Sequence, residues 1–106
     1  MKVRFMRLMV FFDLPTITGK DMREYRTFRK YLLKNGFIMM QESVYSKLVI
    51  NNNSTKILRT QLKKHIPQKG LVQVLEITEK QFASIEYLVG KSQGKVIDSM
   101  DRLVFL

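Results

Sequence analysis

The candidate for chemistry in this sequence is Asp13, a carboxylate at the end of an apolar run. Residues 8–12 are Leu, Met, Val, Phe and Phe, which predict a strand, and Pro15 ends it shortly after Asp13. Two such carboxylates facing each other across a twofold axis would need a bridging cation, and Mg²⁺, with Mn²⁺ as a substitute, suits oxygen ligands. Such a site could activate water for attack on a phosphodiester. The spacing supports equally an Asp13 that only hydrogen-bonds the turn at Pro15.

The other side chains offer little catalytic chemistry. His65 is the one histidine, and its place near the predicted end of a helix favours a helix cap or a core position over catalysis. The absence of cysteine excludes disulfides, thiol nucleophiles and zinc thiolate clusters. Glycine-rich phosphate loops and nucleophile elbows are also missing. Asp13 is therefore the only candidate catalytic and metal-binding residue.

The charge of the chain is strongly basic and unevenly distributed. The sequence has 19 Lys and Arg against 9 Asp and Glu, a formal net charge of +10. Residues 1–75 hold 15 cations and 4 acids, whereas residues 76–106 hold 4 and 5. Such an excess favours a polyanionic partner, because binding releases counterions from phosphates. The alternative is a basic surface that serves only solubility.

The cations of the first predicted helix are spaced on one side of it. Arg23, Arg26 and Lys30 recur at intervals of three and four, where like charges weaken a helix unless an anion lies along them. We therefore expect these three residues to contact phosphates without reading base edges. A weaker set of candidates lies on the second predicted helix: Lys56, Arg59 and Lys63.

The strand before Asp13 is apolar on both of its faces. Side chains alternate along a strand, so Leu8, Val10 and Phe12 point one way while Met9 and Phe11 point the other. A chain of 106 residues hardly has material for two helical layers. We therefore expect the second face to meet another copy of the protein, with Asp13 at the rim of the interface.

Local signals predict two long helices. Thr18 and Asp21 have the spacing of a capping box, and Asn35-Gly36 supplies the stop of the first helix. The second helix should follow the polar turn at 51–54 and end before Pro67. Its buried stripe is predicted to consist of Ile57, Leu58, Leu62 and Ile66.

Strands are predicted around these helices. After the strand that ends at Asp13, residues 37–41 and 43–50 read as strands, joined by a tight turn near Gln41-Glu42 or forming one bent strand. Residues 71–77 form the fourth strand. The order predicts an α+β fold of the ferredoxin-like βαββαβ type. The third strand lacks the glycines and spaced aromatics of an RNA-recognition motif.

The chain reads as one domain, residues 1–106, with a core at about 1–78 and an extension at 79–106 that serves dimer contacts. In the extension we expect a capped helical turn at 78–82, a short strand at 85–89 and a strand at 102–106 that pairs with a sheet edge of the partner subunit. No segment is long and apolar enough for a membrane span or a signal peptide, so a soluble, cytoplasmic protein is expected.

Three stretches resemble a known family in this order: LMVFFDLP at 8–15, GF at 36–37 with QESVY at 41–45, and RLVFL at 102–106. They are similar to the CRISPR-associated Cas2 family, most of all the form found beside the large single-effector DNA nuclease of type II-A systems. The likeness covers nearly the whole chain.

The resemblance implies a ferredoxin-like homodimer that acts in spacer acquisition during antiviral defence. It would bridge two dimers of the CRISPR integrase on a duplex DNA prespacer, with other type II-A adaptation proteins as further partners. The alternative that the resemblance implies is a Mg²⁺-dependent endonuclease acting on RNA or double-stranded DNA, with Asp13 as the metal ligand.

Overall fold

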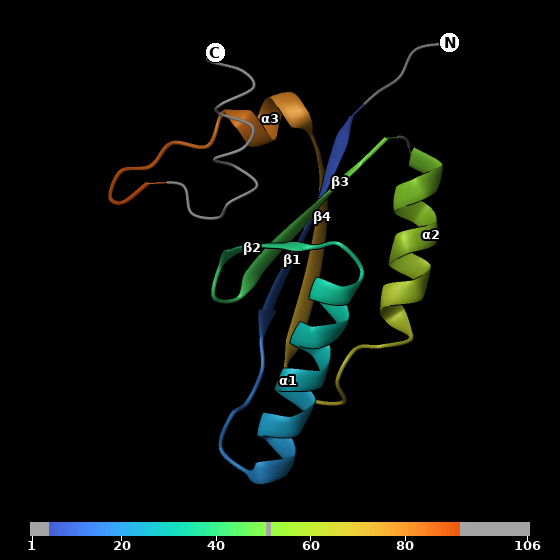
Figure 1. Cartoon of the computed structure of the whole chain (residues 1–106), viewed down its shortest axis with the longest axis vertical. Helices are drawn as coiled ribbons and strands as arrows, with labels where there is room; N and C mark the ends of the chain where they lie inside the picture. The colour runs from blue at the N-terminus through green and yellow to red at the C-terminus, as the bar shows by residue number, and fades with distance from the viewer. Residues whose placement is uncertain (1–4, 51, 92–106) are drawn as a thin grey trace.

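The computed structural model describes residues 5–50 and 52–91, and its elements follow the predicted order (Figure 1). They are β1 (Met6–Asp13), α1 (Gly19–Lys34), β2 (Ile38–Gln41), β3 (Val44–Val49), α2 (Asn52–Lys63), β4 (Leu71–Thr78) and α3 (Glu79–Ala83). A tight turn at Glu42 and Ser43 separates β2 from β3, so the first of the two predicted alternatives is the one observed.

The four strands form one antiparallel sheet in the order β2-β3-β1-β4. Strand β1 is central and pairs along its whole length with β4, from Met6–Thr78 to Asp13–Leu71. Its pairing with β3 is shorter and runs from Met6–Val49 to Phe11–Val44. This arrangement confirms the predicted α+β, ferredoxin-like fold.

The first helix begins and ends at the predicted signals. The Thr18 hydroxyl accepts the backbone N–H of Asp21 at 3.0 Å, and the Asp21 carboxylate accepts the N–H of Thr18 at 3.1 Å. The hydrogen bond from the Thr18 backbone N–H to the ionised carboxylate holds the pKa of Asp21 below its usual value. At the other end Gly36 has a φ of +87°, a conformation that a side chain would strain.

The core lies between the sheet and the two long helices. Leu8, Val10 and Phe12 of β1 pack in one buried cluster with residues of both α1 and α2. Phe12 meets Phe28 edge-on at 5.3 Å and stacks on Tyr45 at 5.6 Å between ring centroids. Aromatic pairs of this kind contribute about 0.5–1.5 kcal/mol beyond the burial of their area.

The predicted buried stripe of α2 is wrong at two of its four positions. Leu58 and Leu62 are buried, but Ile57 is 60% exposed and Ile66 is 48% exposed. The face toward the sheet carries Thr55, Leu58 and Leu62, at spacings of three and four, and Thr55 is fully buried. Ile57 lies about 100° around the helix from Leu58, and Ile66 lies beyond the helix end at Lys63.

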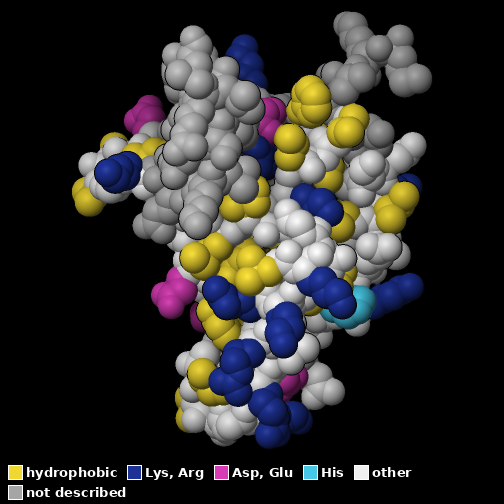
Figure 2. All heavy atoms as spheres, in the orientation of Figure 1, with side chains coloured by type: hydrophobic (Ala, Val, Ile, Leu, Met, Phe, Trp, Pro, Cys, Tyr) yellow, Lys and Arg dark blue, Asp and Glu magenta, His cyan; other side chains and the backbone are white. Residues whose placement is uncertain are grey.

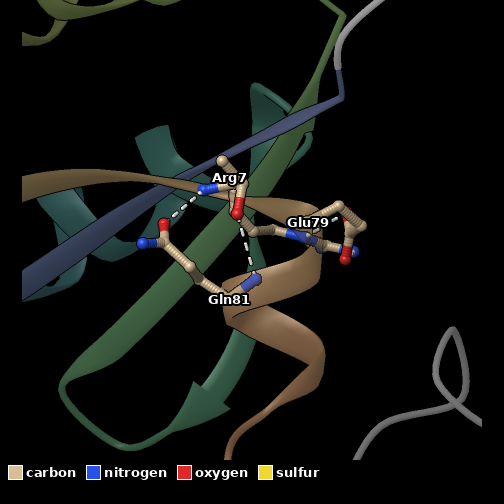
Figure 3. Close-up of polar contacts among 4 residues, drawn as sticks. Arg7, Glu79 and Gln81 are labelled. Atoms are coloured by element: carbon tan, nitrogen blue, oxygen red, sulfur yellow. Dashed lines mark hydrogen bonds and ion pairs between the residues drawn. The ribbon is translucent and has the colours of Figure 1, made fainter.

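The second face of β1, which we call the open face, is covered at one end by the chain itself. Arg7, on this face by strand parity, is only 4% exposed and pairs with Glu79 of α3 (Figure 3). The capped helical turn predicted at 78–82 is confirmed, and its cap is a capping box between Thr78 and Gln81. Met9 lies on the same face and is only 6% exposed. The expectation that one chain can cover only one face of β1 is therefore wrong from Arg7 to Met9.

The segment after α3 does not form the strand predicted at 85–89. The N–H groups of Ser84 and Ile85 bond back to the carbonyls of Gln81 and Phe82, so the chain leaves α3 in a turn. Leu88 and Val89 are 89% and 94% exposed. The strand predicted at 102–106 lies outside the described residues. No helix in the described part of the chain has the length and apolar character needed to cross a membrane.

Candidate functional site

Asp13 is the last residue of β1, and its side chain is exposed. Strand parity places it on the open face, and β4 supplies its neighbour Leu71, which is 52% exposed. Pairing with β3 stops before Asp13, where the N–H of Phe12 donates to the Ser43 carbonyl at 3.0 Å. The carboxylate thus stands at an uncovered corner of the sheet, at the opposite end of the open face from Arg7.

The turn after β1 does not hold the Asp13 carboxylate. Across residues 5–50 and 52–91 that side chain makes no hydrogen bond, so the turn contact that the sequence allowed is absent there. Nor does this part of the chain contain a group of three or more His, Cys, Asp or Glu side chains that could hold a metal ion. Asp13 offers one carboxylate, and the further oxygen ligands that Mg²⁺ needs would come from water, from a substrate phosphate or from a second copy of the protein.

The three cations of the predicted phosphate row are exposed on α1. Arg23, Arg26 and Lys30 form no ion pair with any described residue. Arg29 differs, because its Nε donates to the buried Tyr45 hydroxyl at 2.9 Å and so anchors α1 to β3. Figure 2 shows Lys and Arg side chains gathered over the lower half of the molecule, where α1 lies. The row is free to meet an anion.

A groove of about 470 Å³ runs beside this row, between the start of α1 and the segment after α2. The following residues line it: Lys20, Arg23, Glu24, Thr27, Phe28, His65, Ile66, Pro67 and Gln68. Lys20 extends the row toward the helix start, since it lies three residues before Arg23. The three-residue spacing between Lys20 and Arg23 is visible in the sequence, but Lys20 was not among the residues predicted to contact phosphates.

The cations of α2 divide into two kinds. Lys56 and Lys63 are exposed, as a phosphate contact requires. Arg59 instead pairs with Glu76 of β4, with Nη1 and Oε1 2.7 Å apart, and its side chain is 36% exposed. This ion pair ties α2 to the sheet and neutralises part of the charge that Arg59 could offer a nucleic acid.

His65 serves the end of α2. Its Nδ1 lies 3.0 Å from the Gln61 carbonyl oxygen, and its ring stacks on Tyr31 of α1 with centroids 4.1 Å apart. These contacts confirm the predicted capping role. The stack also joins the end of α2 to α1 at the edge of the groove.

The fold and the site define a class: small ferredoxin-like α+β proteins with a basic helical face and a carboxylate at the end of the first strand. Residues 6–85 match the family described as CRISPR associated protein Cas2. The chain therefore belongs to the Cas2 family of CRISPR systems.

Curated relatives cover most of the chain. It is 48% identical over 101 residues to a protein of Treponema denticola, spanning 95% of this chain and all of the relative. It is also 48% identical over 101 residues to one from Streptococcus mutans serotype c, covering 95% of this chain and 93% of the relative. A third relative, from Ligilactobacillus salivarius, is 43% identical over 101 residues. The match spans 95% of this chain and all of the relative. All three are named CRISPR-associated endoribonuclease Cas2.

Proposed function

We propose that this chain is the DNA-binding subunit of CRISPR spacer acquisition, a homodimer that lies across a duplex prespacer and bridges integrase subunits. The observation that carries the proposal is the exposed row Arg23, Arg26 and Lys30, which has no acidic partner within the described residues. The family resemblance supports the bridging role, and the exposed row of cations supports the binding of duplex DNA.

The length of the row suits a duplex. From Arg23 to Lys30 the helix rises by about 10.5 Å, at about 1.5 Å per residue. A DNA duplex carries a negative charge about every 1.7 Å along its axis, so several phosphates lie within reach of such a row. The row contains no side-chain amides and no pair of arginines placed to bind the edges of bases. We therefore expect its binding to duplex DNA to be independent of base sequence.

The test is reconstitution of spacer integration with purified integrase, the full chain and a DNA duplex. The variant Arg23→Ala/Arg26→Ala/Lys30→Ala should lower duplex binding and integration together, whereas Lys56→Ala/Lys63→Ala should lower them less. Binding and integration that both survive the triple substitution would exclude the row as the DNA contact.

A second candidate function is a Mg²⁺-dependent endonuclease on RNA or double-stranded DNA. The observation that favours it is the exposed Asp13 at the uncovered corner of the open face. Relatives named endoribonucleases support the same activity. Two copies packed through their open faces would bring two Asp13 carboxylates toward one axis, which supplies the oxygen ligands that a single chain lacks. A bound Mg²⁺ would polarise the phosphodiester and its attacking water.

This candidate is tested with Asp13→Asn, which keeps the size of the side chain and removes its charge. Cleavage by the full chain should require Mg²⁺ or Mn²⁺, stop with EDTA and be lost in Asp13→Asn. Glu42→Gln is the matched control, because Glu42 is also an exposed acid beside a strand end. Cleavage that persists in Asp13→Asn would assign the activity to another site or to a contaminant.

A further inference from the structure

Gly70 lies directly against the backbone that carries Asp13. A Cβ atom at Gly70 would be 2.6 Å from the Asp13 carbonyl oxygen, 2.9 Å from Leu14 Cδ2 and 3.1 Å from Leu14 Cα. Two of these three atoms belong to the main chain, so they cannot move aside without moving the end of β1. Gly70 also has a φ of +95°, which disfavours any other residue.

Two other glycines distinguish the effect of the positive φ from the effect of close approach to another main chain. Gly36 and Gly90 have similar φ values, +87° and +84°. A Cβ at Gly36 would meet the flexible end of Lys47, with Nζ at 3.3 Å, and one at Gly90 would meet nothing within 4 Å. All three positions therefore need glycine for backbone conformation, but Gly70 alone among them needs it for close approach to another main chain.

The residues on either side of Gly70 also lie close to the end of β1 at Asp13 or to α1 beside it. Leu71, its neighbour and the first residue of β4, pairs with Asp13 in the sheet. Before Gly70, the N–H of Gln68 points to Glu24 Oε1 of α1 at 3.5 Å. Pro67 and Lys69 pack with Leu14 and Pro15 around a space of only about 10 Å³, too small for more than one water molecule. The connection between α2 and β4 therefore fits tightly against the turn that follows Asp13.

We propose that Gly70 is a positioning residue for the Asp13 carboxylate, acting through direct packing of its backbone on the Asp13 carbonyl. Gly70 holds the end of β1 in place and so sets where the carboxylate stands on the open face. Its importance for cleavage rests on the proposed endonuclease function. The placement of Asp13 itself does not depend on that function.

The test compares Gly70→Ala with Gly36→Ala and Gly90→Ala, which share the cost of a positive φ. The first readout is the amide NMR spectrum of the full chain, in which Gly70→Ala should shift the Asp13 and Leu14 signals. The second is the affinity for Mn²⁺ alone, followed by electron paramagnetic resonance, which should fall at least severalfold in Gly70→Ala. The two controls should leave the Asp13 signal and the Mn²⁺ affinity as in the unsubstituted protein.

Unchanged Asp13 and Leu14 signals in a folded Gly70→Ala variant would overturn the proposal, as would equal changes in the Gly90→Ala control. If Gly70→Ala does not fold, the pair Gly70→Asn and Gly90→Asn decides in the same way, because asparagine tolerates positive φ better than alanine. Absence of Mg²⁺-dependent cleavage by the unsubstituted protein would remove the endonuclease proposal alone, since the amide signals still report whether Gly70 places Asp13.

Discussion

Arg7 of β1 and Glu79 of α3 form a bidentate ion pair, although they lie 72 residues apart in the sequence. Arg7 Nε donates to Glu79 Oε2 and Arg7 Nη2 donates to Glu79 Oε1, each at 3.1 Å. The guanidinium also lies 4.2 Å from the centroid of the Phe82 ring. Together these contacts hold α3 over the start of β1 and leave the Asp13 end of the open face uncovered.

Removing the acid of this pair should destabilise the protein. Glu79→Ala leaves the Arg7 side chain, 5% exposed, without its charged partner, and we expect a loss of about 1–3 kcal/mol in the free energy of unfolding. Urea unfolding measures it. Glu86→Ala, at an exposed acid beyond α3, should stay within about 0.5 kcal/mol. Equal stability of the two variants would show that the ion pair contributes nothing.

The phosphate row predicts a specific salt dependence. Each cation that neutralises one phosphate adds about 0.9 to the slope of log affinity against log salt concentration for duplex DNA. The variant Arg23→Ala/Arg26→Ala/Lys30→Ala should therefore lower the slope by about 2.7 units for each subunit whose row contacts the duplex, and by the same amount on unrelated duplex sequences. Fluorescence anisotropy over a salt series measures both. An unchanged slope would place the DNA on another surface.

The capping box of α1 predicts a stability that depends on pH. The pKa of Asp21 is lowered in the folded protein, mainly by the Thr18 backbone N–H, so the unfolded chain takes up the proton first as pH falls. The stabilisation is thus fully present above the ordinary pKa of 3.8 and is lost as pH falls through the lower folded value. The stability difference between the unsubstituted protein and Asp21→Ala should shrink over this range.

The second capping box provides the control for that experiment. In α3 the acceptor for the Thr78 N–H is the uncharged Gln81 side chain, at 2.9 Å. The effect of Gln81→Ala on thermal unfolding should therefore be the same at pH 6 and pH 3. A pH-independent effect of Asp21→Ala would contradict the assignment of charge to the α1 cap.

The proposed dimer predicts that the open face mediates self-association. Leu75 lies on this face by its pairing with Met9 and is 52% exposed. Leu75→Lys should weaken association at least tenfold, about 1.4 kcal/mol, because it buries a charge in an apolar interface. Leu33→Lys is the control, at a 43% exposed leucine of α1. A stable monomer of the unsubstituted protein in light scattering at micromolar concentration would refute the dimer.

The sequence by itself determined the order of the elements from β1 to α3, the capping box of α1, the capped turn at 78–82 and the helix stop at Asn35-Gly36. These features depend on neighbours a few residues apart, so local hydrogen bonding and backbone conformation decide them. It also placed Asp13 at the end of a strand and the cations of α1 along one helix. The periodicities of strands and helices are sufficient for those positions.

Only the tertiary structure decided which side chains meet across the fold. The burial of Arg7 under α3, the pairing of Arg59 with Glu76 and the exposure of Ile57 depend on segments that approach only when the sheet forms. The contact of Gly70 with Asp13 is of the same kind, because it joins a turn to a strand end 57 positions earlier. Local patterns constrain each segment's own conformation, whereas these contacts depend on how helices and strands pack in three dimensions.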